Sequence, residues 1–259
     1  MIFMTTVGDI YRAIDSFAPF SSQMDFDNAG LLAGDKETEV RTAILSLDIT
    51  PDVVHEAARK KAQLVVSHHP VIFHPLRNLR PGSAPYLLAQ YNIAAICAHT
   101  NLDMAPGGVN DSLAGRLNLK DAAPLVCDSH SGRPAALKCR TEREFLPRKF
   151  AEFVKSRLGC DGLFYADGRR KIDEVGLCSG SGAEYLYDAA ASGCQAFVTG
   201  EAKHNELIDA KNLGITLVVA GHYYTENVVI GPLLNRLSES FPDVAFLRTE
   251  VFSCPEEYL

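Results

Sequence analysis

Short apolar runs alternate with helical patterns along most of this chain. In the first half, the mostly apolar runs at residues 42–47, 64–67 and 93–98 predict buried strands, because each has the length of a strand. Helical patterns follow the runs, and Thr50 with Pro51 is typical of the cap and first turn of a helix. This order predicts βαβ units around a largely parallel sheet.

The second half repeats the same order of elements. Apolar runs at residues 175–179, 196–199 and 215–220 predict strands, and the last helical pattern covers residues 226–238. We therefore expect an α/β fold of two pseudo-repeated lobes, with mainly parallel sheets covered by helices and one site shared between the lobes. The expected lobes are residues 1–123 and 124–259.

Polar residues recur at matching places in the two halves, just after the ends of corresponding strands. They are His68, His69, His99 and Asp103 in the first half and Glu201, His222 and Glu226 in the second. In each half a histidine precedes a carboxylate by four residues. Because ligands of open α/β sheets bind outside the carboxyl ends of the strands, we expect both sets to face one crevice.

Composition and charge narrow the class of protein. Of the 259 residues, 47% are hydrophobic and 22% are charged, as in an ordinary globular protein. The formal net charge of -7 disfavours binding to nucleic acid or to an anionic membrane, because no basic field attracts phosphate.

Seven cysteines without a CxxC pair lie mostly in or beside apolar runs, which predicts reduced thiols and a cytoplasmic protein. No signal peptide or membrane span is visible.

The adjacent pair His68-His69 is the most informative feature of the sequence. Neighbouring residues on a strand point to opposite faces, so the two imidazoles converge only if the strand ends there and the chain turns, as Pro70 favours. The alternative is that one imidazole packs in the core while the other faces water. If they converge, each imidazole could bind a separate ion.

The candidate ligands are nitrogen and oxygen donors. They are His68, His69, Asp103, Glu201, His204, His222 and Glu226. Imidazoles and carboxylates without thiolates are typical of Zn, Mn, Fe, Ni or Co sites rather than of a sulfur-rich structural zinc. A carboxylate can bridge two ions, and ions about 3.5–4 Å apart are a recurring hydrolytic device. Five protein ligands with one bridge would leave positions for water or substrate, as in an open catalytic or binding site.

Several of these candidates have a simpler interpretation. His222 and Glu226 could form a weak pair on an exposed helix face, although the preceding glycine and apolar run favour a strand-to-helix turn. Asp103 could form an Asx-turn or a cap ahead of Pro106.

Three further residues are candidates for supporting or catalytic roles. They are His99, Glu201 and His204. Each could orient a ligand through a hydrogen bond, or act as a general acid or base. The alternatives are that His99 is a satisfied core residue and that His204 is an exposed helix residue.

Five motifs of the chain occur in the order found in one known family. They are Asp27-Asn28-Ala29-Gly30-Leu31-Leu32-Ala33-Gly34, Ser67-His68-His69-Pro70, His99-Thr100-Asn101-Leu102-Asp103 with Gly107-Gly108-Val109-Asn110-Asp111, Thr199-Gly200-Glu201, and Gly221-His222-Tyr223-Tyr224-Thr225-Glu226. Together they resemble the Nif-three-like dinuclear metal centre proteins, whose members are often named GTP cyclohydrolase 1 type 2 homologues. The resemblance extends from near the N-terminus to about residue 240.

The resemblance implies a two-lobed α/β fold and a toroidal homohexamer. It also implies two divalent metal ions per chain, in a site that faces the internal cavity of the ring. In that site His68 and Asp103 would hold one ion, His69 and His222 would hold the other, and Glu226 would bridge them.

The chain departs from the family pattern at two places. Phe26 stands where the family commonly has Trp, and we interpret it as an aromatic packing substitution. Longer relatives carry an inserted domain between the halves, and the linking segment at residues 121–171 is too short for it.

These observations favour a metal-dependent hydrolase that uses a metal-activated water. The family name suggests GTP, but the sequence contains no GxxxxGKS or GxxxxGKT phosphate loop, so the small-molecule substrate stays unidentified. The alternative is a non-catalytic, hexameric protein for metal binding, regulation or metal delivery.

Overall fold

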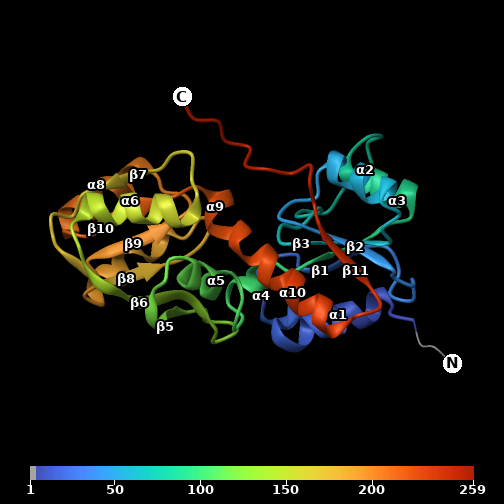
Figure 1. Ribbon diagram of the computed structural model, residues 1–259, viewed down its shortest axis with the longest axis horizontal. Helices are drawn as coiled ribbons and strands as arrows, with labels where there is room; N and C mark the ends of the chain where they lie inside the picture. The colour runs from blue at the N-terminus through green and yellow to red at the C-terminus, as the bar shows by residue number, and fades with distance from the viewer. Residues whose placement is uncertain (1–3) are drawn as a thin grey trace. The chain divides into compact units, whose positions relative to one another are not determined.

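Two β-sheets with packed helices make up the structure, a computed structural model that describes residues 4–259 (Figure 1). The chain divides into two compact units. The first unit comprises the chain up to Ala105 together with Ile230–Ser253, and the second comprises Pro106–Val229 and Cys254–Leu259. The first three residues, part of the stretch in which no leader is predicted, lie outside the described residues.

The first unit is built on a five-stranded sheet. Its strands are β1 (Gly30–Ala33), β2 (Thr42–Ser46), β3 (Leu64–Ser67), β4 (Ala94–Cys97) and β11 (Ala245–Arg248). Its helices are α1 (Val7–Phe17), η1 (Phe20–Ser22), α2 (Pro51–Arg59), α3 (Ala84–Tyr91), α4 (Thr100–Asp103) and α10 (Ile230–Ser240). The strands lie in the order β1-β4-β3-β2-β11, with β1 antiparallel to its neighbour and the others parallel.

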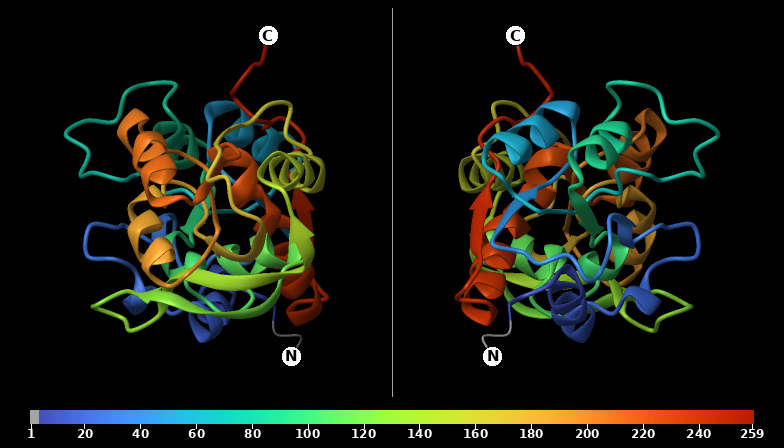
Figure 2. Two further views of the ribbon diagram at one scale, coloured as in Figure 1. Left: turned by 90° about the vertical axis from the view of Figure 1, so that its left-hand side faces the viewer. Right: turned by 90° about the vertical axis from the view of Figure 1, so that its right-hand side faces the viewer.

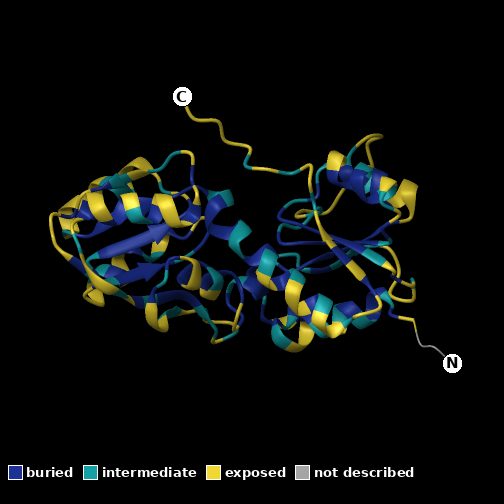
Figure 3. Ribbon diagram, in the orientation of Figure 1, coloured by how far each residue is buried: buried dark blue, intermediate teal, exposed yellow. Residues whose placement is uncertain are grey.

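Apolar spacing explains these elements. All four residues of β3 and of β4 are buried, as expected for central strands covered on both faces (Figure 3). Helix α2 begins after Thr50, whose side chain accepts the backbone N–H of Val53 at 3.3 Å. Its buried face carries Val53, Val54 and Ala57, at the spacing of one helix face.

The second unit is built on a six-stranded sheet. Its strands are β5 (Lys120–Cys127), β6 (Pro134–Phe145), β7 (Phe164–Ala166), β8 (Ile172–Leu177), β9 (Ala196–Thr199) and β10 (Thr216–Val219). Its helices are α5 (Val109–Arg116), α6 (Pro147–Leu158), η2 (Ala183–Tyr185), α7 (Leu186–Ala191), α8 (His204–Leu213), α9 (His222–Glu226) and η3 (Asn227–Val229). The strand order is β5-β6-β8-β9-β10-β7, and β8, β9 and β10 run parallel.

The two sheets share a four-strand pattern. The order β1-β4-β3-β2 of the first unit matches the order β7-β10-β9-β8 of the second. In both, an antiparallel edge strand precedes three parallel strands along the chain. The prediction of an α/β fold with two sheets is therefore confirmed, and the repeat seen in the sequence corresponds to a repeated strand order.

Other features differ from the sequence expectations. The boundary expected between residues 123 and 124 falls inside β5, which pairs with β6 in an antiparallel hairpin of the second unit. Helix α10 and strand β11 return to the first unit. The single helix expected at 226–238 is interrupted near its start, because the 3-10 turn η3 separates Glu226, the last residue of α9, from α10.

A long loop follows β3 and stands out from the first unit as the teal segment of Figure 2. Its base is tied down by Asn28, whose side-chain amide donates to the carbonyl oxygen of Ile72 at 2.6 Å. Residues 73–82 are all exposed, and they include Leu76 and Leu79. Long loops without secondary structure are often functional in compact proteins.

Candidate metal centre

Two imidazoles meet where β3 ends. His68 is buried, and its Nδ1 lies 2.9 Å from the carbonyl oxygen of Ala98, so this nitrogen carries a proton and donates it. His69 is half-buried, and its Nδ1 lies 2.9 Å from Oδ1 of Asp48. The two ring centroids are 5.0 Å apart. The chain thus keeps both rings together at the strand end, where it turns into Pro70.

A third imidazole joins this pair from the segment that follows β4. The ring of His99 lies 5.2 Å from that of His68 and 5.6 Å from that of His69, measured between centroids. Each of the three rings offers a nitrogen, and these nitrogens lie within 4.8 Å of one another. The first unit therefore contains a histidine group that could hold a metal ion.

Asp27 sets the orientation of His99. Its Oδ1 lies 2.7 Å from Nδ1 of His99, and its Oδ2 accepts the backbone N–H of Thr100 at 3.0 Å. Burial alone would raise the pKa of Asp27, but the hydrogen bonds from His99 and Thr100 lower it to about 2. The carboxylate is therefore ionised at neutral pH and accepts the Nδ1–H, which makes Nε2 the basic nitrogen of His99.

Asp103 brings a carboxylate to the same group as the last residue of α4. Its Oδ1 lies 3.5 Å from Nε2 of His68, a separation that suits two ligands of one ion better than a hydrogen bond. The capping role considered for it near Pro106 is filled by Asp111, whose Oδ2 accepts the backbone N–H of Gly107 at 2.7 Å.

The short helix α9 of the second unit carries a histidine and a carboxylate that lie close together. Nε2 of His222 lies 2.9 Å from Oε2 of Glu226, and Nδ1 of His222 lies 2.8 Å from Oε1 of Glu201. Glu226 is 4% exposed, so the two residues do not form a weak pair on an exposed helix face. Gly221 has a φ of 90°, which permits the sharp turn from β10 into α9.

Two further glycines make room for α9. A Cβ atom at Gly180, where φ is +58°, would lie well under 3.0 Å from Oε1 of Glu226. One at Gly200 would lie 2.7 Å from Oγ1 of Thr225 and 2.9 Å from Cα of His222. These glycines follow β8 and β9, so the ends of three neighbouring strands close around the carboxylate.

Glu201 and His204 differ in their surroundings. Oε2 of Glu201 accepts the hydroxyl of Ser181 at 2.6 Å. This hydrogen bond lowers the pKa of Glu201, burial opposes it, and the hydrogen bond with His222 lowers it further. Glu201 therefore orients His222, one of the two roles predicted for it. His204 is exposed as the first residue of α8, as in the simpler interpretation of this residue.

The four imidazoles share one arrangement. They are His68, His69, His99 and His222. In each, Nδ1 faces an oxygen acceptor, which is a backbone carbonyl in one case and a carboxylate in three. Metal-ligating histidines are usually held this way, with one ring nitrogen anchored and the other presented to the ion. The histidine group of the first unit therefore fits a divalent metal ion, and His222 of the second unit is held in the same manner.

Sequence reasoning missed some of these anchoring residues. Asp48 was not singled out, although it follows the end of β2 at the same sheet edge as the histidines, which is a usable signal. Asp27 entered only as part of a family motif, and Ser181 carries no signal of its own. Phe26, expected to be a packing substitution, is 64% exposed, with its ring 6.5 Å from that of Phe73.

The cysteines have no part in these groups. All seven are free thiols, and four of them are buried. Burial raises the pKa of Cys97 well above its ordinary value, so this thiol stays protonated next to the histidines. It donates to the carbonyl oxygen of His68 at 2.9 Å. The expectation of a centre without thiolate ligands agrees with this chemistry.

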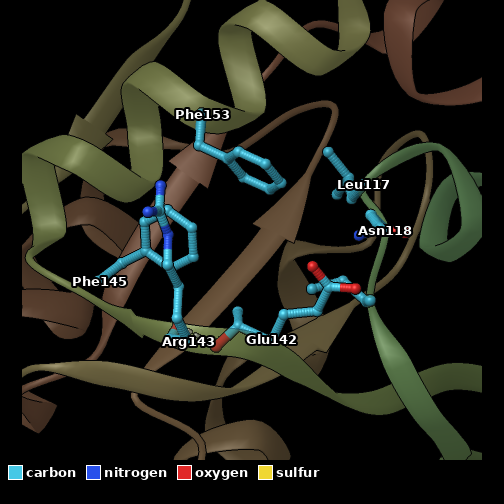
Figure 4. Close-up of a pocket in the computed structure, with 8 residues that line it drawn as sticks. Leu117, Asn118, Glu142, Arg143, Phe145 and Phe153 are labelled. Carbon is cyan, nitrogen blue, oxygen red and sulfur yellow. Dashed lines mark hydrogen bonds between the residues drawn. The ribbon is translucent and has the colours of Figure 1, made fainter.

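A separate cavity of about 260 Å³ lies in the second unit. Figure 4 shows Phe153 of α6 and Arg143 and Phe145 of β6 around it, with Leu117 on the opposite side. The guanidinium of Arg143 stacks over the ring of Phe145, 5.1 Å from its centroid. None of the candidate metal ligands lines this cavity.

Comparison with known proteins bears on the whole chain. A family model described as Duf34/NIF3 (NGG1p interacting factor 3) matches residues 5–255. A protein of Clostridium perfringens named GTP cyclohydrolase 1 type 2 homolog is 29% identical over 264 residues, which cover 98% of this chain and 99% of the relative. No helix within residues 4–259 has the length and apolar character needed to cross a bilayer.

Solved structures show the same architecture. A hypothetical protein of Staphylococcus aureus, 27% identical, superposes with a TM-score of 0.93 and covers 99% of this chain and 100% of its own. A Bacillus cereus protein related to NIF3 has a TM-score of 0.90 at 20% identity, over 99% of each chain. The second likeness concerns the fold alone.

Proposed function

This chain belongs to the Duf34/NIF3 (NGG1p interacting factor 3) family, and from that premise we propose that it binds two divalent metal ions and is a metal-dependent hydrolase. Each unit provides part of the proposed site. His68 and Asp103 would hold one ion, His69 and His222 would hold the other, and Glu226 would be a ligand of both.

The anchoring of the imidazoles is the observation that carries this proposal. A fixed Nδ1–H sets both the tautomer and the direction of the ring, so that Nε2 is ready to bind an ion. Asp48 anchors His69 at 2.9 Å and Glu201 anchors His222 at 2.8 Å, and these are the two histidines assigned to one ion. A carboxylate anchor also raises the basicity of the imidazole, which strengthens a metal bond.

Two divalent ions, when bound, would polarise a substrate oxygen and activate water near neutral pH. His99 is assigned to neither ion. With its Nδ1–H held by the ionised carboxylate of Asp27, its Nε2 is suited to accept a proton during hydrolysis and to return it to a leaving group. Glu201 serves as a positioning residue, because its carboxylate is occupied by His222 and Ser181.

The substrate class follows the relatives only in part. The C. perfringens relative is named a GTP cyclohydrolase 1 type 2 homolog, and we propose small phosphoester, nucleotide or amide substrates for this chain. GTP itself is not part of the proposal, because the sequence contains no GxxxxGKS or GxxxxGKT phosphate loop.

A homohexamer in the cytoplasm completes the proposal. The resemblance to the family implies the hexamer, and the exposed apolar side chains of Phe73, Leu76 and Leu79 support self-association of the first unit. Seven free thiols suit a reducing compartment.

A second candidate function is metal binding for regulation or delivery, without catalysis. The side chain of His222 is 30% exposed, and an ion held there would exchange with solvent more readily than one in a closed site. Fast exchange serves delivery, whereas retention through many turnovers serves catalysis.

Elemental analysis of the purified protein, loaded with Zn²⁺ or Mn²⁺, tests both functions. We expect about two ions per chain in the wild type and about one in His69→Ala. His130→Ala, which alters an exposed histidine of the second unit, is the matched control and should keep both ions. Fewer than about one ion per wild-type chain after loading would overturn both functions.

Turnover separates the two functions. If the loaded protein hydrolyses members of a phosphoester, nucleotide and amide panel, and His69→Ala abolishes this while size-exclusion chromatography shows the same oligomer, hydrolysis is supported. Two bound, readily exchangeable ions without turnover would contradict hydrolysis and support delivery.

A further inference from the structure

Three segments of the second unit meet beside the turn that carries His222. They are residues 160–162 after α6, residues 220–224 around the start of α9, and the C-terminal tail Cys254–Leu259. Sγ of Cys160 donates to the carbonyl oxygen of Ala220 at 3.3 Å, and the hydroxyl of Tyr224 donates to Oδ2 of Asp161 at 2.8 Å. The first two segments are therefore tied together directly.

The tail lies on the bare backbone of two glycines. A Cβ atom at Gly162 would overlap the ring of Tyr258, with three ring atoms nearer than 3.0 Å. One at Gly221 would lie 3.0 Å from Oε2 of Glu256 and 3.6 Å from the hydroxyl oxygen of Tyr258. That hydroxyl donates to Oε2 of Glu256 at 2.9 Å, which joins the two tail residues above Gly221. Tyr258 and Glu256 can lie there because neither Gly162 nor Gly221 has a side chain.

Gly221 lies beneath this cover. It is the residue before His222, and its φ of 90° is one that glycine adopts readily. Tyr258 is 44% exposed, and the atoms of its ring that lie nearest Gly162, with its hydroxyl near Gly221, tie the tail to the turn.

We propose that the C-terminal tail is a positioning element for His222, with Tyr258 as the positioning residue that holds the Gly221 turn. The inference rests on the proposed role of His222 as a metal ligand. Without the tail, the peptide before His222 samples more conformations, and the imidazole reaches its ion less often. The first ion, proposed to be held by His68 and Asp103, meets this helix only through Glu226, which is buried at the other end of α9, so we expect it to weaken less.

A titration of the full-length protein with Co²⁺, followed by its visible absorption, tests the inference. Gly162→Ala puts a methyl group where Tyr258 sits, and we expect about tenfold weaker binding of one of the two Co²⁺ ions. Gly115→Ala is the matched control, since nothing lies within 4 Å of the added methyl group. It should bind both ions as the wild type does.

Variants of Tyr258 test the same contact from the other residue. Tyr258→Ala should also weaken one ion about tenfold, and Tyr258→Phe, which keeps the ring, should bind within about threefold of the wild type. In the double variant Gly162→Ala with Tyr258→Ala, the methyl group no longer meets a ring. Its affinity should equal that of Tyr258→Ala alone, because the two changes act through one contact.

His222→Ala distinguishes a failure of the tail inference from a failure of the proposed metal site. If His222→Ala loses one Co²⁺ ion while Tyr258→Ala binds both ions with wild-type affinity, the tail inference is overturned and the metal site stands. Equal weakening of both ions in Tyr258→Ala also overturns the inference, because it indicates a general loss of structure. If His222→Ala keeps both ions with full affinity, the proposed site and the inference fail together.

Discussion

The two units have the same four-strand order but different chemistry at the edge where their strands end. In the first unit, the ends of β3 and β4 lead to three imidazoles and one carboxylate. In the second, the ends of β9 and β10 lead to one imidazole and two carboxylates. Strand order therefore determines where side chains emerge, while the residues after each strand determine which donors they present. A repeated strand order can thus present different sets of donor side chains in the two units.

The largest expected effect comes from the buried carboxylate of the second unit. Because Glu226 is proposed to bridge both ions, Glu226→Ala should weaken metal binding more than about 100-fold, beyond the roughly 10–100-fold cost of losing an orienting partner. Isothermal titration with Zn²⁺ measures the loss. Glu239→Ala changes an exposed glutamate of α10 and should bind normally. Two tightly bound ions in Glu226→Ala would contradict the bridge.

The second-largest effect on metal binding is expected at Gly180, the glycine that leaves room for the side chain of Glu226. Gly180→Ala places a methyl group against Oε1 of Glu226 and should weaken metal binding at least tenfold, as judged by the same titration. Gly82→Ala is the control, because Gly82 also has a positive φ, +81°, but nothing lies within 4 Å of its added methyl group. Both variants carry backbone strain of about 1–2 kcal/mol. Equal metal affinity in the two variants would show that the contact with Glu226 does not matter.

The anchors of the two units offer a direct comparison. Asp48→Asn and Glu201→Gln each replace a carboxylate that orients one histidine, and each should weaken metal binding about 10–100-fold. Similar losses are expected because His69 and His222 are proposed to hold the same ion. Competition with a chromogenic chelator measures both affinities. A loss in one variant alone would separate the two histidines and break the proposed pairing.

The smallest effect on metal binding is expected at Glu56, a buried carboxylate of the first unit. Burial would raise its pKa, but hydrogen bonds from Lys60, Thr249 and the N–H of Glu250 lower it below the ordinary value of 4.5. Its contribution to stability is therefore complete above about pH 4.5 and is lost as the pH falls through the lowered folded-state pKa.

Glu56→Gln tests this separation of stability from metal binding. It should lower the free energy of unfolding by about 1–3 kcal/mol at pH 7, measured with urea. The difference from the wild type should shrink below about pH 4, where the wild-type carboxylate takes up its proton. Metal content should not change at pH 7. A pH-independent difference would mean that Glu56 acts through packing instead of charge.

Much of the scaffold was predictable because central strands are short, continuous apolar runs. The bounds of β3 and β9 agree with prediction, and the family expected from five motifs is confirmed. By contrast, the helix expected at 226–238 misses the break at η3, since helical spacing of apolar residues continues across it. Strand β11 was missed although residues 244–247 are an apolar run of strand length, and only one of its four residues is buried.

The site was predictable only where its chemistry is local. A histidine pair at a strand end and a histidine four residues before a carboxylate are visible in the sequence. The anchors are not local, because Asp27 reaches His99 across 72 residues and Asp48 reaches His69 across 21. Their contacts depend on how the strands pair, and the sequence states that pairing only indirectly.

The return of β11 to the first unit has a consequence for synthesis of the chain. Residues 106–229 form most of the second unit as one continuous stretch, and β11 pairs with β2 only after that stretch has been translated. During translation the second unit can fold while the first still exposes an edge of its sheet at β2. The sheet of the first unit is therefore completed after the sheet of the second, although most of its residues leave the ribosome first.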